Sequence, residues 1–148
     1  MTRYEKTWKR DLTYSLWHRK LEDDLTFIDI DACEYCAKCY EPLALIELAR
    51  DVGQKHKPSI VTKKLARKAG IPAYRVFYKV NKKGKIVAFR VKELYPDESE
   101  EIKMTPEEYA DFLRGLRRGH TCPSKPPKKQ EENKKKEASK PILLADLL

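Results

Sequence analysis

The sequence contains no hydrophobic run long enough to cross a membrane. A spanning helix takes about 20 predominantly apolar residues, and no stretch of this chain approaches that length. The first residues are polar and charged, and no apolar signal core follows them, so we expect a cytoplasmic protein without a membrane partner. In such a chain, the four cysteines favour free thiols or a metal site over disulfides.

Asparagine and glutamine are scarce, whereas 37% of the residues are charged, against about 25% in an average globular chain. Dense Lys, Arg and Glu is a composition seen in thermophile proteins. The formal net charge of +9 favours an anionic partner, and nucleic acid ranks before a membrane surface. No internal repeat, helix-turn-helix or zinc-finger helix is visible, so we expect contacts to backbone or shape rather than base readout.

The pattern of apolar residues predicts one α/β domain over residues 13–119, preceded by a basic extension at residues 1–12. Helices are predicted over residues 4–21, 59–70 and 105–119, and strands over residues 25–35, 43–48, 72–80 and 86–91. In the second helix, Ile60, Val61, Leu65 and Ala69 are expected to face the core. The last helix has the clearest local signature, because Thr105, Pro106 and Glu108 form a capping box with proline at the first helical position.

From His120 the composition changes to proline, lysine and glutamate. Residues 120–148 are predicted to be a disordered basic tail, because they cannot bury enough apolar surface to offset the entropy of ordering. The tail closes with an apolar peptide at residues 142–148. That peptide is either an incidental end or a docking segment for a protein partner.

Three carboxylates carry the sharpest chemical hypothesis. Asp29 and Asp31 would point to one face of a strand, and if Tyr35 pairs with Leu43, Asp31 lies opposite Glu47 with Cβ atoms about 5 Å apart. Such a pair repels unless a proton or a cation relieves it, and Mg²⁺ or Mn²⁺ would do so. These acids could instead form a solvated face, with Glu47 paired to a basic neighbour. The apolar run around Glu47 favours a metal or catalytic role.

Several segments together resemble small phage-type proteins of the PD-(D/E)XK restriction-endonuclease-like superfamily. They are Trp17-His18-Arg19 on a helix, Ile28-Asp29-Ile30-Asp31-Ala32-Cys33-Glu34-Tyr35, Pro42-Leu43-Ala44-Leu45-Ile46-Glu47, and Ile71-Pro72-Ala73-Tyr74 leading into a strand. The resemblance covers about residues 14–80. It implies a small mixed sheet flanked by helices, and metal-dependent hydrolysis of phosphodiester bonds in DNA. By position, it makes Asp31 and Glu47 the Mg²⁺ ligands, with the carbonyl of Leu48 as a third and Asp29 as a further candidate.

The chain departs from that family at one position. Ala49 stands where the family has a lysine, and it can neither donate a proton nor stabilise charge. Lys63 or Lys64, on the following helix, could supply the missing charge. Without such a lysine, the domain would be a catalytically inactive DNA-binding protein of the same fold. A third interpretation is a virus-encoded regulator that binds a host protein through its tail.

The cysteines suggest a second metal site. Cys36 and Cys39 have the spacing of half a zinc knuckle, in which a tight turn aims both thiolates at one tetrahedral centre. His120 and Cys122 could complete a structural zinc site, as could Cys33. Alternatively, Cys33 is a buried residue and the other two are incidental turn thiols.

Basic residues recur in separate segments of the predicted domain, and each phosphate contact would make binding more salt-sensitive. Such runs are also common as plain solvated faces. The candidate nucleic-acid contacts are Lys63, Lys64, Arg67, Lys68, Lys82, Lys83, Lys85, Arg114, Arg117 and Arg118.

Overall fold

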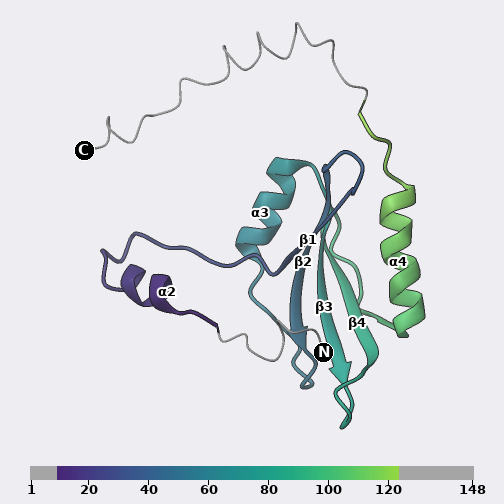
Figure 1. Ribbon diagram of the computed structural model, residues 1–148, viewed down its shortest axis with the longest axis horizontal. Helices are drawn as coiled ribbons and strands as arrows, with labels where there is room; N and C mark the ends of the chain where they lie inside the picture. Colours follow the sequence, from purple (N-terminus) through teal and green to yellow (C-terminus); the bar gives the residue numbers. More distant parts are fainter. Residues whose placement is uncertain (1–9, 124–148) are drawn as a thin grey trace, which may run out of the picture. The chain divides into compact units, whose positions relative to one another are not determined.

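The computed structural model describes residues 10–123 of the 148, and it divides between Ile30 and Asp31 into two units (Figure 1). The predicted tail beyond residue 123, its terminal apolar peptide and the first nine residues lie outside the described residues. None of the helices within residues 10–123 is long and apolar enough to cross a membrane.

The first unit contains the short helix α2 (Thr13–His18) and the segment that follows it. Aromatic rings hold the helix to that segment: the His18 and Phe27 ring centroids are 4.5 Å apart, and those of Tyr14 and Phe27 are 5.4 Å apart. The predicted strand over residues 25–35 is confirmed only from Ala32 onward. His18 therefore belongs to an aromatic cluster.

The second unit is built on an open, mixed sheet with the strand order β1-β2-β3-β4-β5. Its strands are β1 (Ala32–Tyr35), β2 (Pro42–Arg50), β3 (Ala73–Val80), β4 (Ile86–Tyr95) and β5 (Ile102–Met104). Only β2 and β3 are parallel, and α3 (Ile60–Ala69) connects them, since parallel neighbours need a crossover. The α/β class is thus confirmed, while β5 and the extension of β4 beyond residue 91 were not predicted.

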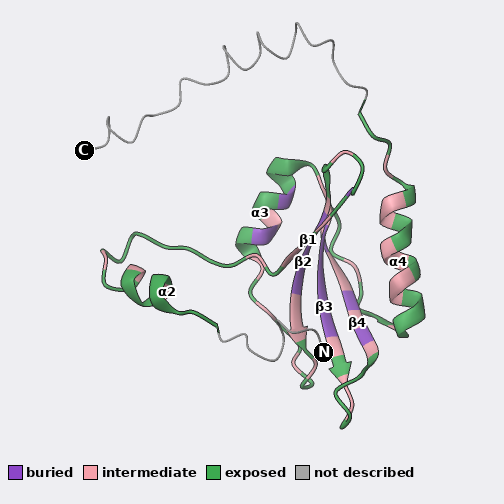
Figure 2. Cartoon of the chain, viewed as in Figure 1, coloured by how far each residue is buried: buried purple, intermediate pink, exposed green. Residues whose placement is uncertain are grey.

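The hydrophobic core lies on the face of the sheet covered by α4 (Pro106–Arg118), where alternate strand residues point inward (Figure 2). The core residues are Ala44, Ile46, Tyr74, Val76, Phe89 and Val91. The predicted capping box is confirmed, because the Thr105 side chain accepts from the Glu108 N–H and the Glu108 side chain from the Thr105 N–H, both at 3.1 Å. Tyr109 then stacks on Phe89 with ring centroids 4.2 Å apart. Local capping and an apolar stripe together fix this helix.

The opposite face of the sheet carries α3, and here the predicted inward side is wrong. Ile60, Val61 and Leu65 are 72%, 52% and 42% exposed, whereas Thr62 and Ala66 are fully buried. Thr62 faces the sheet because its hydroxyl donates a hydrogen bond to the carboxylate of Glu47 on β2. The helix therefore turns its small Thr62/Ala66 stripe toward the sheet.

Candidate functional sites

The register of β1 against β2 brings Asp31 next to Leu48. Ala32 pairs with Ile46 and Cys33 with Leu45, which is the predicted register, although a bulge pairs Tyr35 with Pro42 rather than Leu43. The Leu48 N–H donates to Oδ2 of Asp31 at 2.9 Å. This hydrogen bond holds the Asp31 side chain, just before β1, beside the strand that carries Glu47.

Lys57, in the loop between β2 and α3, joins these groups. Its Nζ lies 3.0 Å from Oε2 of Glu47 and 2.6 Å from the carbonyl oxygen of Leu48, and it forms an ion pair with Asp31. The three N–H donors of an ammonium match three acceptors. One cation thus contacts the same three groups that the resemblance assigns to a metal ion, and we call these four residues, Asp31, Glu47, Leu48 and Lys57, the acidic cluster.

Burial makes Glu47 dependent on its partners. Its side chain is 5% exposed, and its two oxygens are engaged separately, Oε1 by Thr62 and Oε2 by Lys57. A buried carboxylate without partners would cost several kcal/mol, on the order of the desolvation of an ion. The Glu47 carboxylate is tolerated in an apolar strand because Thr62 on α3 and Lys57 in the preceding loop are its partners.

Hydrogen bonds within the acidic cluster favour the charged forms of Asp31 and Lys57. Burial alone would raise the pKa of Asp31, but hydrogen bonds from Lys57 and from the Leu48 N–H outweigh it and lower that pKa below its usual value. Burial likewise opposes the charge on Lys57, but its hydrogen bonds to Asp31 and Glu47 raise the Lys57 pKa above its usual value. At neutral pH the Lys57 ammonium and the Asp31 carboxylate therefore form an ion pair.

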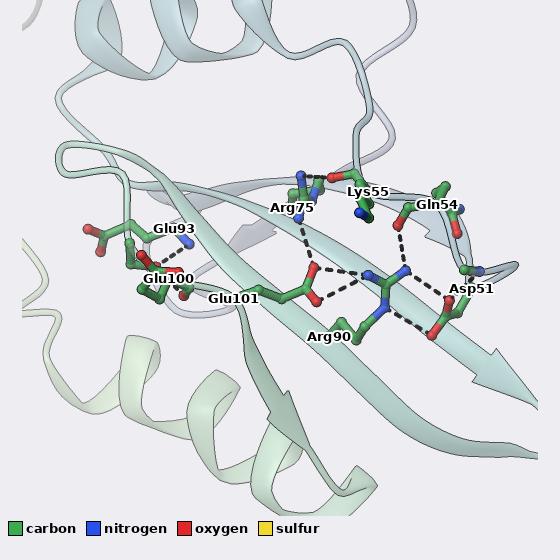
Figure 3. Close-up of polar contacts among 10 residues, drawn as sticks. Asp51, Gln54, Lys55, Arg75, Arg90, Glu93, Glu100 and Glu101 are labelled. Carbon is green, nitrogen blue, oxygen red and sulfur yellow. Dashed lines mark hydrogen bonds and ion pairs between the residues drawn. The ribbon is translucent and has the colours of Figure 1, made fainter.

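The loop that carries Lys57 is held by two arginines of the sheet (Figure 3). Arg90 donates to the carbonyl of Gln54 at 2.7 Å and pairs with Asp51 at 2.9 Å, and Arg75 donates to the carbonyl of Lys55 at 2.9 Å. Glu101 bridges the two guanidinium groups, which also lie 4.6 and 4.7 Å from the centre of the Phe77 ring. This network, absent from the sequence predictions, anchors the loop just before Lys57.

The lysines proposed as replacements for Ala49 are used differently. Lys63 pairs with Glu98, and Lys64 is exposed on α3. Asp29 lies in the first unit, where it pairs with Arg10 at 2.9 Å. Lys57 was missed because it lies in a polar loop; the available signal was the absence of a motif lysine, which directs attention to every lysine near Glu47.

A cluster of cysteines and a histidine lies at one end of the sheet, where the β1–β2 turn and the segment after α4 lie close together (Figure 1). The Sγ atoms of Cys36 and Cys122 are 3.8 Å apart, and Sγ of Cys39 is 3.2 Å from Nε2 of His120. All four candidate ligand atoms lie within 4.8 Å of one another, an arrangement that could hold a metal such as zinc. Cys33 is exposed and outside the cluster.

The turn geometry prepares Cys36 for ligation. Tyr40 takes a left-handed φ of 63°, and its N–H donates to the Cys36 carbonyl at 2.7 Å. The backbone N–H of Cys39, with that of Lys38, lowers the pKa of Cys36 to about 6, while hydrogen bonding with Cys39 and Cys36 raises the pKa of Cys122. The turn therefore presents Cys36 as a thiolate at neutral pH, close to the sulfur of Cys122 in the segment after α4.

The basic residues predicted to contact nucleic acid occupy three regions of the second unit. Lys64, Arg67 and Lys68 are exposed on α3, and Lys82, Lys83 and Lys85 are exposed at the β3–β4 turn. At the end of α4, Arg114 pairs with Asp111 at 2.7 Å, followed by half-buried Arg117 and exposed Arg118.

The fold and the two clusters define an α/β protein with a mixed open sheet, a lysine-bridged acidic cluster and a Cys/His cluster suited to a metal. Searches with family models, against curated proteins and against solved structures find no match to this chain.

Proposed function

We propose that the second unit is a metal-dependent phosphodiesterase domain that acts on DNA or another structured nucleic acid. The observation that carries this proposal is the convergence of the Asp31 and Glu47 side chains and the Leu48 carbonyl on one cation, the ammonium of Lys57. The antiparallel β1–β2 hairpin, followed by α3 and a parallel β3, also supports it, because this is the order of elements implied by the resemblance.

The oxygen donors fit a hard divalent ion. Asp31, Glu47 and the Leu48 carbonyl would hold Mg²⁺ or Mn²⁺, which such ligands and water suit. When bound, the ion would polarise a phosphoryl oxygen and lower the pKa of an attacking water. The ion needs the oxygens that now accept from Lys57, so ion binding and the ion pairs of Lys57 compete.

Lys57 would supply the positive charge that Ala49 cannot. It comes from the loop rather than from β2, yet its ammonium contacts both carboxylates. Displaced from them by a divalent ion, it would remain beside the site as a donor to a phosphate oxygen. This charge is worth most where water is excluded, and Lys57 is only partly exposed.

Cleavage assays test the proposal. We expect Mg²⁺ or Mn²⁺ to support cleavage of duplex, branched or single-stranded DNA, and Asp31→Asn or Glu47→Gln to abolish it. Lys57→Met should lower the rate by about 10²-fold or more, as loss of one electrostatic donor does. It should retain or tighten Mn²⁺ binding, because the competing ammonium is gone. Asp29→Asn, which alters the exposed pair with Arg10 in the first unit, is the matched control and should cleave normally.

One observation favours a second candidate, an inactive nucleic-acid-binding protein. Because the Lys57 ammonium already contacts the carboxylates of both Asp31 and Glu47, it could stand permanently in place of a metal. In that case no DNA form is cut, Mn²⁺ does not bind at Asp31 and Glu47, and salt-sensitive DNA binding survives Asp31→Asn. Cleavage that depends on both carboxylates contradicts this candidate.

A further inference from the structure

We propose that Cys36, Cys39, His120 and Cys122 form a structural zinc site that clamps the segment after α4 to the β1–β2 turn. This inference is independent of the acidic cluster and of any catalytic activity. It depends on the ligand distances, the chemistry of the ligand set and the position of the cluster in the fold.

The distances are those of one tetrahedral centre. Zinc bonds of about 2.3 Å to sulfur and about 2.0 Å to nitrogen place neighbouring ligand atoms about 3.5–3.8 Å apart. The Cys36–Cys122 separation is 3.8 Å, and Cys39 lies 3.2 Å from the His120 ring nitrogen. These two pairs are within about 0.3 Å of the tetrahedral spacing, and all four ligand atoms lie within 4.8 Å of one another, close enough to converge on one ion.

The ligand set selects zinc and a structural role. Three thiolates and one imidazole are a common set for structural zinc, and four protein ligands leave no open position for a substrate. Most of the cluster is sheltered, since Cys36 is fully buried and Cys39 and His120 are half-buried, whereas Cys122 is exposed. Hard ions such as Mg²⁺ prefer oxygen ligands, so the two clusters would not compete for one metal.

The position of the cluster explains what zinc would do. Strand β1 is a four-residue strand at the edge of the sheet, and within residues 10–123 it pairs only with β2. Cys36 and Cys122 are separated by 86 residues in sequence, so a shared ion would close a long loop and hold both ends of the described fold together.

Metal analysis of the full-length protein, purified without chelators and under reducing conditions, tests the proposal. We expect one zinc per chain. Replacing zinc with Co²⁺ should give the visible absorption of tetrahedral cobalt and a thiolate charge-transfer band. Cys39→Ser and His120→Ala should lose or weaken both signals, whereas Cys33→Ser, on the same hairpin, should retain them.

Several results would overturn the inference. They are a wild-type chain that holds no zinc and takes up no cobalt, bound iron or an iron–sulfur chromophore, a Cys36–Cys122 disulfide under the same conditions, or unchanged cobalt spectra in Cys39→Ser and His120→Ala. The zinc content and the cobalt spectrum of the wild-type chain need no variant, so the inference can still be overturned if a variant fails to fold.

Discussion

Lys57 places a positive charge beside Asp31 and Glu47 from outside the β2 segment that contains Glu47 and Ala49. The residue two positions after Glu47 is alanine, so the linear motif lacks its lysine. In the folded chain, an ammonium nevertheless contacts Asp31, Glu47 and the Leu48 carbonyl. The chemistry of the site is therefore set by which side chains meet, whatever their spacing in sequence.

The ion pair between Asp31 and Lys57 predicts a defined dependence of stability on pH. The lowered pKa of Asp31 contributes stability above its unfolded pKa of about 3.9, and this is lost as the pH falls through the folded pKa. The raised pKa of Lys57 contributes stability below about 10.4, and this is lost as the pH rises through the folded value. We therefore expect the contribution to be constant between about pH 5 and 9.

Urea unfolding of the wild type and Asp31→Asn across pH 2 to 7 measures this effect. The wild type should exceed the variant in free energy of unfolding by about 1–3 kcal/mol near neutral pH, and the difference should shrink below about pH 4. Asp29→Asn, which alters an exposed pair, should show little difference at any pH. A difference between the wild type and Asp31→Asn that does not change with pH would contradict the assigned pKa direction.

At the scale of elements, the loop between β2 and α3 depends on arginines from other strands. Arg90 binds both Asp51 and the carbonyl of Gln54, and Arg75 binds the carbonyl of Lys55. These contacts fix the loop backbone just before Lys57. A rigid anchor of this kind keeps the Lys57 ammonium in register with Glu47.

We expect Arg90→Gln to loosen this loop without unfolding the domain. Amide hydrogen exchange should become faster over residues 51–57, because local opening costs less free energy once its anchors are removed, while exchange in β3 should remain slow. Arg114→Gln, at an exposed pair on α4, is the control and should leave the loop unchanged. Unaltered exchange in Arg90→Gln would show that Arg90 does not anchor the loop.

Helices α3 and α4 differ in how far their sequences determine them. The capping box and apolar stripe of α4 are local signals, so its start and its inward side follow from residues within one or two turns. The inward side of α3 does not, because Thr62 is turned inward by Glu47 on β2. Apolar periodicity alone chose the wrong side because it ignores buried polar partners.

For the whole molecule, the proposed zinc site predicts that metal binding contributes to the stability of the fold. Structural zinc binding is coupled to folding free energy, and 1 kcal/mol shifts the melting temperature of a domain of this size by about 4–8 °C. A strong chelator should therefore lower the Tm by more than about 5 °C, and added zinc should restore it. In calorimetry, the chelator should lower the Tm of Cys33→Ser as much as that of the wild type. The Tm of Cys39→Ser should be below that of the untreated wild type, both with and without chelator.

The sequence by itself determined the parts that depend on neighbours in the chain. These are most of strands β1 to β4, the β1–β2 register that puts Asp31 beside Glu47, the cap of α4 and the Cys36–Cys39 turn. Tertiary structure decided the rest, since Lys57, Thr62 and the arginine anchors reach Glu47 and its loop from separate elements. His120 and Cys122 were named from sequence as zinc ligands, but only the folded chain brings them to the turn. Hydrogen bonds and ion pairs act over a few ångströms in space, and sequence distance does not limit which groups meet.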